Sequence, residues 1–186
     1  MRIARAIFIG ILLLLTAGCQ KNHEKPVVIE QADPEIQCAT IEISPFSYVC
    51  LSSQGNFRDY QSAVDTFRAE ASIQGFELAD TLLAIFDHAP GEGTGPMNWD
   101  IGFVVPESLV VMEPLQVKKW NFNRVVQAKY QGPENKLETI YPLVSKFMRS
   151  HHLSPAGPIV ERFPANHPSN VPTEFATEIW FAIKNE

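Results

Sequence analysis

The sequence predicts an α+β domain made of two similar strand-helix-strand-strand units related by a pseudo-twofold axis. The first observation is an internal repeat. When the sequence is shifted by 77 residues, identical residues coincide: Gln54-Gly55 with Gln131-Gly132, Val49 with Val126, and Phe86 with Phe163. The second observation is that apolar residues recur at helical spacing after each Gln-Gly pair. The third is that side chains in the segments after each helix alternate between two faces, as in β-strands. We therefore expect antiparallel sheets, two outer helices and a central cleft between the halves.

The chain begins with the pattern of a secretory signal. Arg2 and Arg5 form a basic head, Ala6 to Leu15 is an unbroken apolar run, and the small residues Ala17 and Gly18 follow. The order of basic head, apolar middle and small-residue site is typical of a signal peptide, and a membrane span would need about 20 apolar residues. We expect residues 1–18 to be removed.

The sequence Ala17-Gly18-Cys19 resembles the lipobox of bacterial lipoproteins, whose cysteine receives the lipid. The resemblance implies lipidation of Cys19, and two acyl chains suffice for stable attachment to a membrane. Gln20, which follows the cysteine, favours the outer membrane over the inner membrane. Residues 19–35 are polar and contain two prolines, so we interpret them as a tether between the membrane and a domain at 36–186.

Composition argues against nucleic-acid binding. Removal of residues 1–18 takes away two arginines and no acids, which leaves 13 basic and 21 acidic residues. The remaining sequence contains no basic stripe that could neutralise phosphates. About 150 residues are enough for one domain with a hydrophobic core.

Two strands are expected at the start of the domain, Ile36–Ile43 and Phe46–Ser53, with Ser44-Pro45 between them. A hairpin at this point would bring Cys38 close to Cys50. Because an exported chain meets an oxidising compartment, the two cysteines are expected either to form a structural disulfide or to remain as free buried thiols.

The remaining elements follow the repeat. Tyr60, Val64, Phe67 and Ala71 predict the first helix, with Gly75 as its C-terminal stop, and Leu137 to Met148 predict the second. Pro133 suits the first turn of the second helix, whereas Pro142 is expected to kink it. The other predicted strands are Leu82–Asp87, Trp99–Val105, Ile159–Phe163 and Phe175–Ile183. The glycine-rich segment 91–95 lacks the Lys-Ser/Thr of a phosphate-binding loop, so we interpret it as a hairpin loop.

Alternation along the last predicted strand indicates the residues of a ligand pocket. Phe175, Thr177, Ile179, Phe181 and Ile183 share the side expected to face the helices, so Glu178 and Trp180 lie on the opposite side with two small alanines. Asp100 lies near the related position of the first half, and Glu161 and Phe163 again place a carboxylate beside an aromatic ring. A buried carboxylate needs a partner, which a cationic ligand held by aromatic walls would provide.

Several motifs resemble those of one family: Gly132-Pro133-Glu134 with Leu137, Tyr141, Val144 and Phe147; Asp100 to Glu107 as a "D-x-G-x-x-V-P" strand; and Gly157-Pro158, Glu161, Phe163 and Thr177 to Trp180. The chain resembles, over roughly residues 36–184, the GyrI-like (gyrase-inhibitor-like) domains, which include the effector-binding domains of AraC-type and MerR-type regulators. The resemblance implies a central pocket for amphipathic or cationic organic molecules. In that pocket Glu178 would be the acid of the last strand and Glu161 a second glutamate. Phe147 and Phe163 replace the usual Trp and Tyr.

The resemblance leaves three functions open. The chain is expected to be a tethered receptor for a small organic ligand, a hydrolase of reactive cyclopropane-bearing molecules, or a structural lipoprotein with a vestigial pocket. In a hydrolase, Glu178 would be catalytic and would act on water with a tyrosine partner, for which Tyr48, Tyr130 and Tyr141 are candidates. The related SOUL proteins are associated with haem, but the histidines here are expected on the surface. We therefore expect no cofactor and no metal site.

Overall fold

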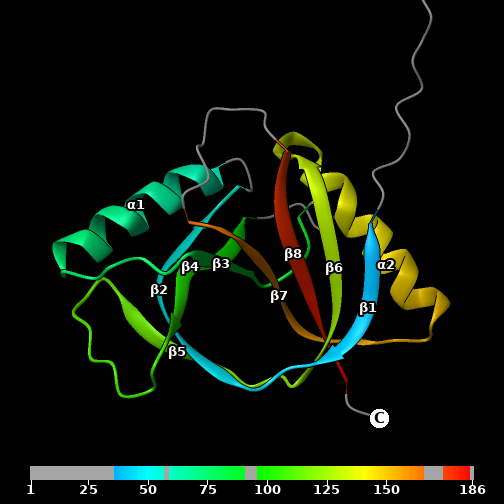
Figure 1. The fold of residues 1–186 in the computed structure, drawn as a ribbon, viewed down its shortest axis with the longest axis horizontal. Helices are drawn as coiled ribbons and strands as arrows, with labels where there is room; N and C mark the ends of the chain where they lie inside the picture. The colour runs from blue at the N-terminus through cyan, green and yellow to red at the C-terminus, as the bar shows by residue number, and fades with distance from the viewer. Residues whose placement is uncertain (1–35, 57–58, 91–95, 166–173, 185–186) are drawn as a thin grey trace, which may run out of the picture. The chain divides into compact units, whose positions relative to one another are not determined.

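The computed structural model describes residues 36–56, 59–90, 96–165 and 174–184, which form an α+β domain as predicted (Figure 1). Residues 1–35, which contain the predicted signal, lipid site and tether, and the glycine-rich segment 91–95 lie outside the described residues. The described elements are β1 (Gln37–Glu42), β2 (Phe46–Gly55), α1 (Tyr60–Ile73), β3 (Thr81–Phe86), β4 (Met97–Val105), β5 (Gln116–Trp120), β6 (Arg124–Pro133), the 3-10 helix η2 (Glu134–Thr139), α2 (Ile140–Ser150), β7 (Pro155–Pro164) and β8 (Glu174–Ile183). None of the helices in these ranges is both long and apolar enough to cross a bilayer.

The strands form one antiparallel sheet of eight described strands in the order β1-β6-β8-β7-β3-β4-β2-β5. The two repeated units are β2-α1-β3-β4 and β6-α2-β7-β8, so equivalent strands occupy mirrored positions in this order. The units meet where β3 pairs with β7, and there Ala84 lies opposite Glu161. These two residues are equivalent under the shift of 77, so the pseudo-twofold axis passes through this pair.

The predicted hairpin between the first two strands is wrong. β1 pairs with β6 of the second unit, and β5 pairs with β2 of the first unit, so each unit receives the strand that precedes the other. β2 has β4 and β5 on its two edges, which leaves no edge for β1. Pro45 also restricts Ser44 to an extended backbone, so the connection carries the chain across the sheet instead of reversing it.

The strand exchange separates the two cysteines, and the disulfide alternative is wrong because both thiols are free. Cys38 lies opposite Ala128 on β6, whereas Cys50 lies opposite Gly102 on β4. Burial, followed by the nearby Asp100 carboxylate, raises the pKa of the Cys50 thiol to about 12. Because the thiolate is the reactive form of cysteine, Cys50 is inert at neutral pH.

The two helices confirm the predicted spacing but correct one expectation. Val64, Phe67 and Ala71 of α1 are buried, and Gly75 follows with a φ of 77°, a conformation that favours glycine. Pro142 does not lie in the interior of the second helix, because α2 begins at Ile140, after the 3-10 turn. Pro142 is therefore the third residue of α2. A backbone N–H at this position would have no helical partner, so the proline costs α2 no hydrogen bond.

The sheet has two different faces. On the face that we call the helix face, side chains of α1 and α2 pack with strand residues that include Val49, Leu82, Ile101, Val126 and Ile179. On the other side, which we call the reverse face, a smaller apolar cluster contains Tyr48, Cys50, Leu83, Trp120, Val160 and Trp180 and no helix residue. The predicted alternation of β8 is confirmed, because Ile179, Phe181 and Ile183 belong to the helix face and Trp180 and Ala182 to the reverse face.

Candidate functional site

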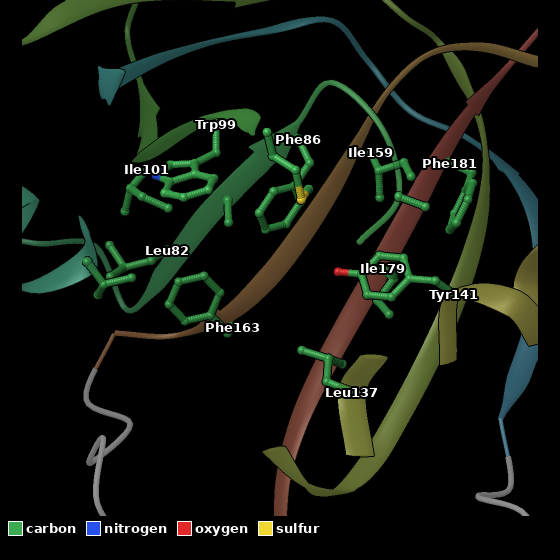
Figure 2. Close-up of a cluster of buried hydrophobic side chains, with 14 of the residues drawn as sticks. Leu82, Phe86, Trp99, Ile101, Leu137, Tyr141, Ile159, Phe163, Ile179 and Phe181 are labelled. Atoms are coloured by element: carbon green, nitrogen blue, oxygen red, sulfur yellow. The ribbon is translucent and has the colours of Figure 1, made fainter. Parts of the chain in front are cut away.

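A buried carboxylate lies at the pseudo-twofold axis on the helix face. Glu161 of β7 has only 1% of its surface exposed, and the Tyr141 hydroxyl of α2 donates a hydrogen bond to its Oε1. Figure 2 shows the Tyr141 oxygen pointing away from α2 towards the middle of the sheet. Ala84, on the neighbouring strand β3, faces Glu161 with the smallest apolar side chain. The local fold therefore places one acid among apolar groups.

Aromatic side chains flank this acid on both sides. Phe163 lies two residues after Glu161 on β7, opposite Leu82, and Phe86 lies two residues after Ala84 on β3, opposite Ile159. Phe86 and Phe163 are equivalent residues of the two units, so the axis places them symmetrically about the Ala84–Glu161 pair. Figure 2 shows both rings beside β3 and β7. Both rings are buried on the helix face. The arrangement surrounds a potential negative charge with flat apolar surfaces.

The acid and its tyrosine occur in one unit only. Under the shift of 77, the residues equivalent to Tyr141 and Glu161 are Val64 and Ala84. Val64 and Ala84 are buried apolar residues of the same core. The axis therefore carries a single carboxylate in a nearly symmetric apolar frame.

Glu178 occupies a different place from Glu161. It lies on the reverse face, half-buried, and accepts a hydrogen bond of 2.7 Å from the Arg162 guanidinium. The same guanidinium stacks over Trp180, with its central carbon 4.5 Å from the ring centroid. Glu178 and Arg162 line a pocket of about 780 Å³ near the ends of β7 and β8, together with Tyr130 and Phe163. Of the predicted residues, this pocket therefore contains Glu178, Tyr130 and Phe163.

Tyr48 and Asp100 form a third cluster, also on the reverse face. Asp100 accepts hydrogen bonds from the Tyr48 hydroxyl (3.1 Å), the Ser52 hydroxyl (2.7 Å) and the Lys118 ammonium (2.8 Å). Burial and the neighbouring Asp100 carboxylate raise the pKa of the Tyr48 hydroxyl. The Asp100 carboxylate thus accepts hydrogen bonds from side chains of β2 and β5, and these contacts join the two strands to β4.

The structure therefore divides the predicted site residues into three groups and does not bring Glu161 and Glu178 together. Sequence reasoning missed the cationic partners of the reverse face, Arg162 and Lys118. Arg162 could have been found, since its alternation places it on the side of β7 opposite Glu161. Lys118 could not have been found in this way, because its contact with Asp100 depends on the exchanged strand β5. Within the described ranges, no three His, Cys, Asp or Glu side chains lie together as metal ligands would.

Comparison with protein families decides the assignment of this fold. The family of GyrI-like small molecule binding domains matches residues 37–184, which include every described strand and both helices. The chain belongs to this family. The GyrI-like domain here thus includes β1, whose exchange between units completes the sheet.

Solved structures share the GyrI-like fold at low sequence identity. The C-terminal domain of EcmrR has a TM-score of 0.67 at 15% identity, over 81% of this chain and 99% of that domain. EcmrR in its complex with DNA has a TM-score of 0.68 at 14% identity, but the match covers only 58% of that chain against 81% of this one. A hydrolase from Listeria innocua has a TM-score of 0.59 at 12% identity, over 82% of this chain and 94% of that one.

A further neighbour of this GyrI-like domain is SAV2435 bound to tetraphenylphosphonium, with a TM-score of 0.50 at 15% identity, over 81% of this chain and 94% of that one. No protein with a curated function matches the sequence. At these identities the structural likeness establishes the fold.

Proposed function

We propose that the protein is a lipid-anchored receptor outside the cytoplasm that binds hydrophobic organic cations at Glu161. The observation that carries the proposal is the buried carboxylate of Glu161, between the equivalent rings of Phe86 and Phe163. A carboxylate attracts a cation far more strongly in such surroundings than in water. The aromatic rings add apolar contact and cation–π attraction for the organic part of the ligand.

The geometry favours Glu161 over Glu178, which sequence reasoning placed first. Glu178 already has a cationic partner in Arg162, and Lys129 of β6 lies opposite it in the sheet. A ligand cation approaching Glu178 would meet two positive side chains and would have to displace one of them. Tetraphenylphosphonium, which the structural neighbour SAV2435 binds, has one delocalised positive charge inside four phenyl groups and suits the aromatic frame around Glu161.

The anchor rests on the N-terminal sequence. The basic head, the apolar run and the small residues before Cys19 support export and lipidation, and the polar residues 19–35 would hold the GyrI-like domain away from the bilayer. We place the domain in the periplasm, with the outer membrane favoured by Gln20. Ligand capture would then occur at a membrane surface, where hydrophobic cations accumulate.

Tetraphenylphosphonium is expected to raise the melting temperature of the purified protein, whereas its anionic isostere tetraphenylborate is not. At a ligand concentration 100-fold above Kd, binding stabilises the folded state by about 2.7 kcal/mol. For a domain of this size that corresponds to a rise of about 5–10 °C. Differential scanning calorimetry with both ions measures the effect. Equal stabilisation by both ions would contradict a role for the carboxylate, and no effect of either ion would favour a vestigial pocket.

A hydrolase is the second candidate, and the hydrogen bond between Tyr141 and Glu161 favours it. The hydroxyl of Tyr141, one of the three predicted tyrosine partners, donates a hydrogen bond to a glutamate of the helix face. Glu161 could accept a proton from water while Tyr141 orients its carboxylate. The Listeria innocua hydrolase shares the fold. Turnover of a cyclopropane-bearing electrophile by the wild-type protein, lost in Glu161→Gln, would support this candidate.

A further inference from the structure

The pocket where β7 ends and β8 begins contains positively charged side chains, which a site for cations would not need. It has a volume of about 780 Å³, and its charged side chains are Lys129, Arg162 and Glu178. The three residues form a row across neighbouring strands, because Glu178 of β8 lies opposite Lys129 of β6 on one side and opposite Arg162 of β7 on the other. The row contains two cations and one anion, so it has a net positive charge.

Both cations can offer hydrogen bonds to a ligand. Arg162 donates a hydrogen bond through Nη1 to Glu178. Because a guanidinium has five N–H donors, other donors of this group remain available for a ligand. Stacking on Trp180 fixes the plane of this group and leaves its edge as the donor surface. Among the described residues, the exposed Lys129 ammonium has no ion-pair partner. A planar carboxylate is the anion that a guanidinium edge matches best.

Other walls of the same pocket are apolar. Phe163 and Tyr130 line it from the helix-face side of their strands, and Pro164 lines it where β7 ends. We propose that this pocket binds a small organic acid, with its carboxylate on Arg162 and Lys129 and its flat apolar part against Phe163 and Tyr130. This site uses different charged groups from the site at Glu161, which does not line the pocket, although Phe163 borders both, and it selects ligands of the opposite charge.

Isothermal titration of the full-length protein with 1-naphthoate tests the proposal. Lys129→Gln removes one cation and should weaken naphthoate binding at least fivefold. Glu178→Gln removes the competing carboxylate from Arg162 and should strengthen binding about threefold or more. Lys119→Gln is the matched control, since it makes the same charge change on β5 beside Glu107 and should leave the affinity unchanged. Circular dichroism of each variant verifies the fold.

The sign of the Glu178→Gln effect separates a site for anions, in which Glu178 competes with the ligand, from a site in which Glu178 helps to bind the ligand. Weaker naphthoate binding in Glu178→Gln, or equal effects of Lys129→Gln and Lys119→Gln, would overturn the proposal, as would no binding by the wild-type protein. Inorganic phosphate that displaces naphthoate at equal concentration would overturn the organic-acid part. Tetraphenylphosphonium binding should be unchanged in Lys129→Gln, so failure at this pocket is distinguishable from failure at Glu161.

Discussion

Gly102→Ala is expected to destabilise the protein by about 4 kcal/mol or more, a large share of the 5–15 kcal/mol typical of a folded domain. A Cβ atom at Gly102 would lie 1.8 Å from the backbone oxygen of Val49 and 2.8 Å from its carbonyl carbon. Backbone atoms of a central strand cannot rotate away as a side chain can. Gly102 also pairs with Cys50 on β2 and Leu83 on β3, so alanine would force both ladders of β4 apart.

Urea denaturation followed by circular dichroism measures this loss, with Gly75→Ala as the matched control. Gly75 has a φ of 77°, and a Cβ atom there would meet nothing within 4 Å, so alanine costs only the left-handed conformation, about 1–2 kcal/mol. A Gly102→Ala variant no less stable than Gly75→Ala would contradict the close packing of β2 and β4. The close approach also explains why the strand motif that begins at Asp100 contains a glycine at its third position.

Glu161→Gln is expected to lower the affinity for tetraphenylphosphonium at least about tenfold. Glutamine preserves the size of the side chain and an oxygen that can accept the Tyr141 hydrogen bond. It removes the carboxylate that would pair with the phosphonium. At an effective dielectric constant of about 20, two unit charges about 6 Å apart attract by about 3 kcal/mol, and 1.4 kcal/mol is one factor of ten. Isothermal titration calorimetry of the variant against wild type gives the ratio.

Glu178→Gln is the control for that experiment, because it removes the same charge from the reverse face. Its affinity for tetraphenylphosphonium should stay close to that of the wild-type protein. The opposite result, with binding lost in Glu178→Gln and kept in Glu161→Gln, would return the ligand to the acid that the sequence alone favoured.

Much of the fold could be predicted because it depends on local patterns. The shift of 77 residues identified the two units, and alternation in β8 separated Ile179 from Trp180. The exchange of β1 and β5 could not be predicted, since it depends on which strand edges remain free after the sheet has formed. The position of Pro142 likewise depended on the 3-10 turn, which delays the start of α2 until Ile140.

The candidate site was predicted as residue types but not as a constellation. Sequence analysis placed Glu161 and Glu178 in one pocket, and the apolar neighbours of Glu178 in sequence made it the stronger candidate. Arg162 reverses the ranking of the two glutamates, because it lies opposite Glu178 on the neighbouring strand and already pairs with its carboxylate. Local sequence indicates which face a carboxylate occupies, whereas the sheet register determines whether a cation already neutralises it.

The position of bound tetraphenylphosphonium tests the central claim most directly. In a crystal structure of the complex, the phosphonium should lie on the helix face against Glu161, with its phenyl groups on Phe86 and Phe163. A phosphonium bound on the reverse face beside Glu178 and Trp180 would contradict this account.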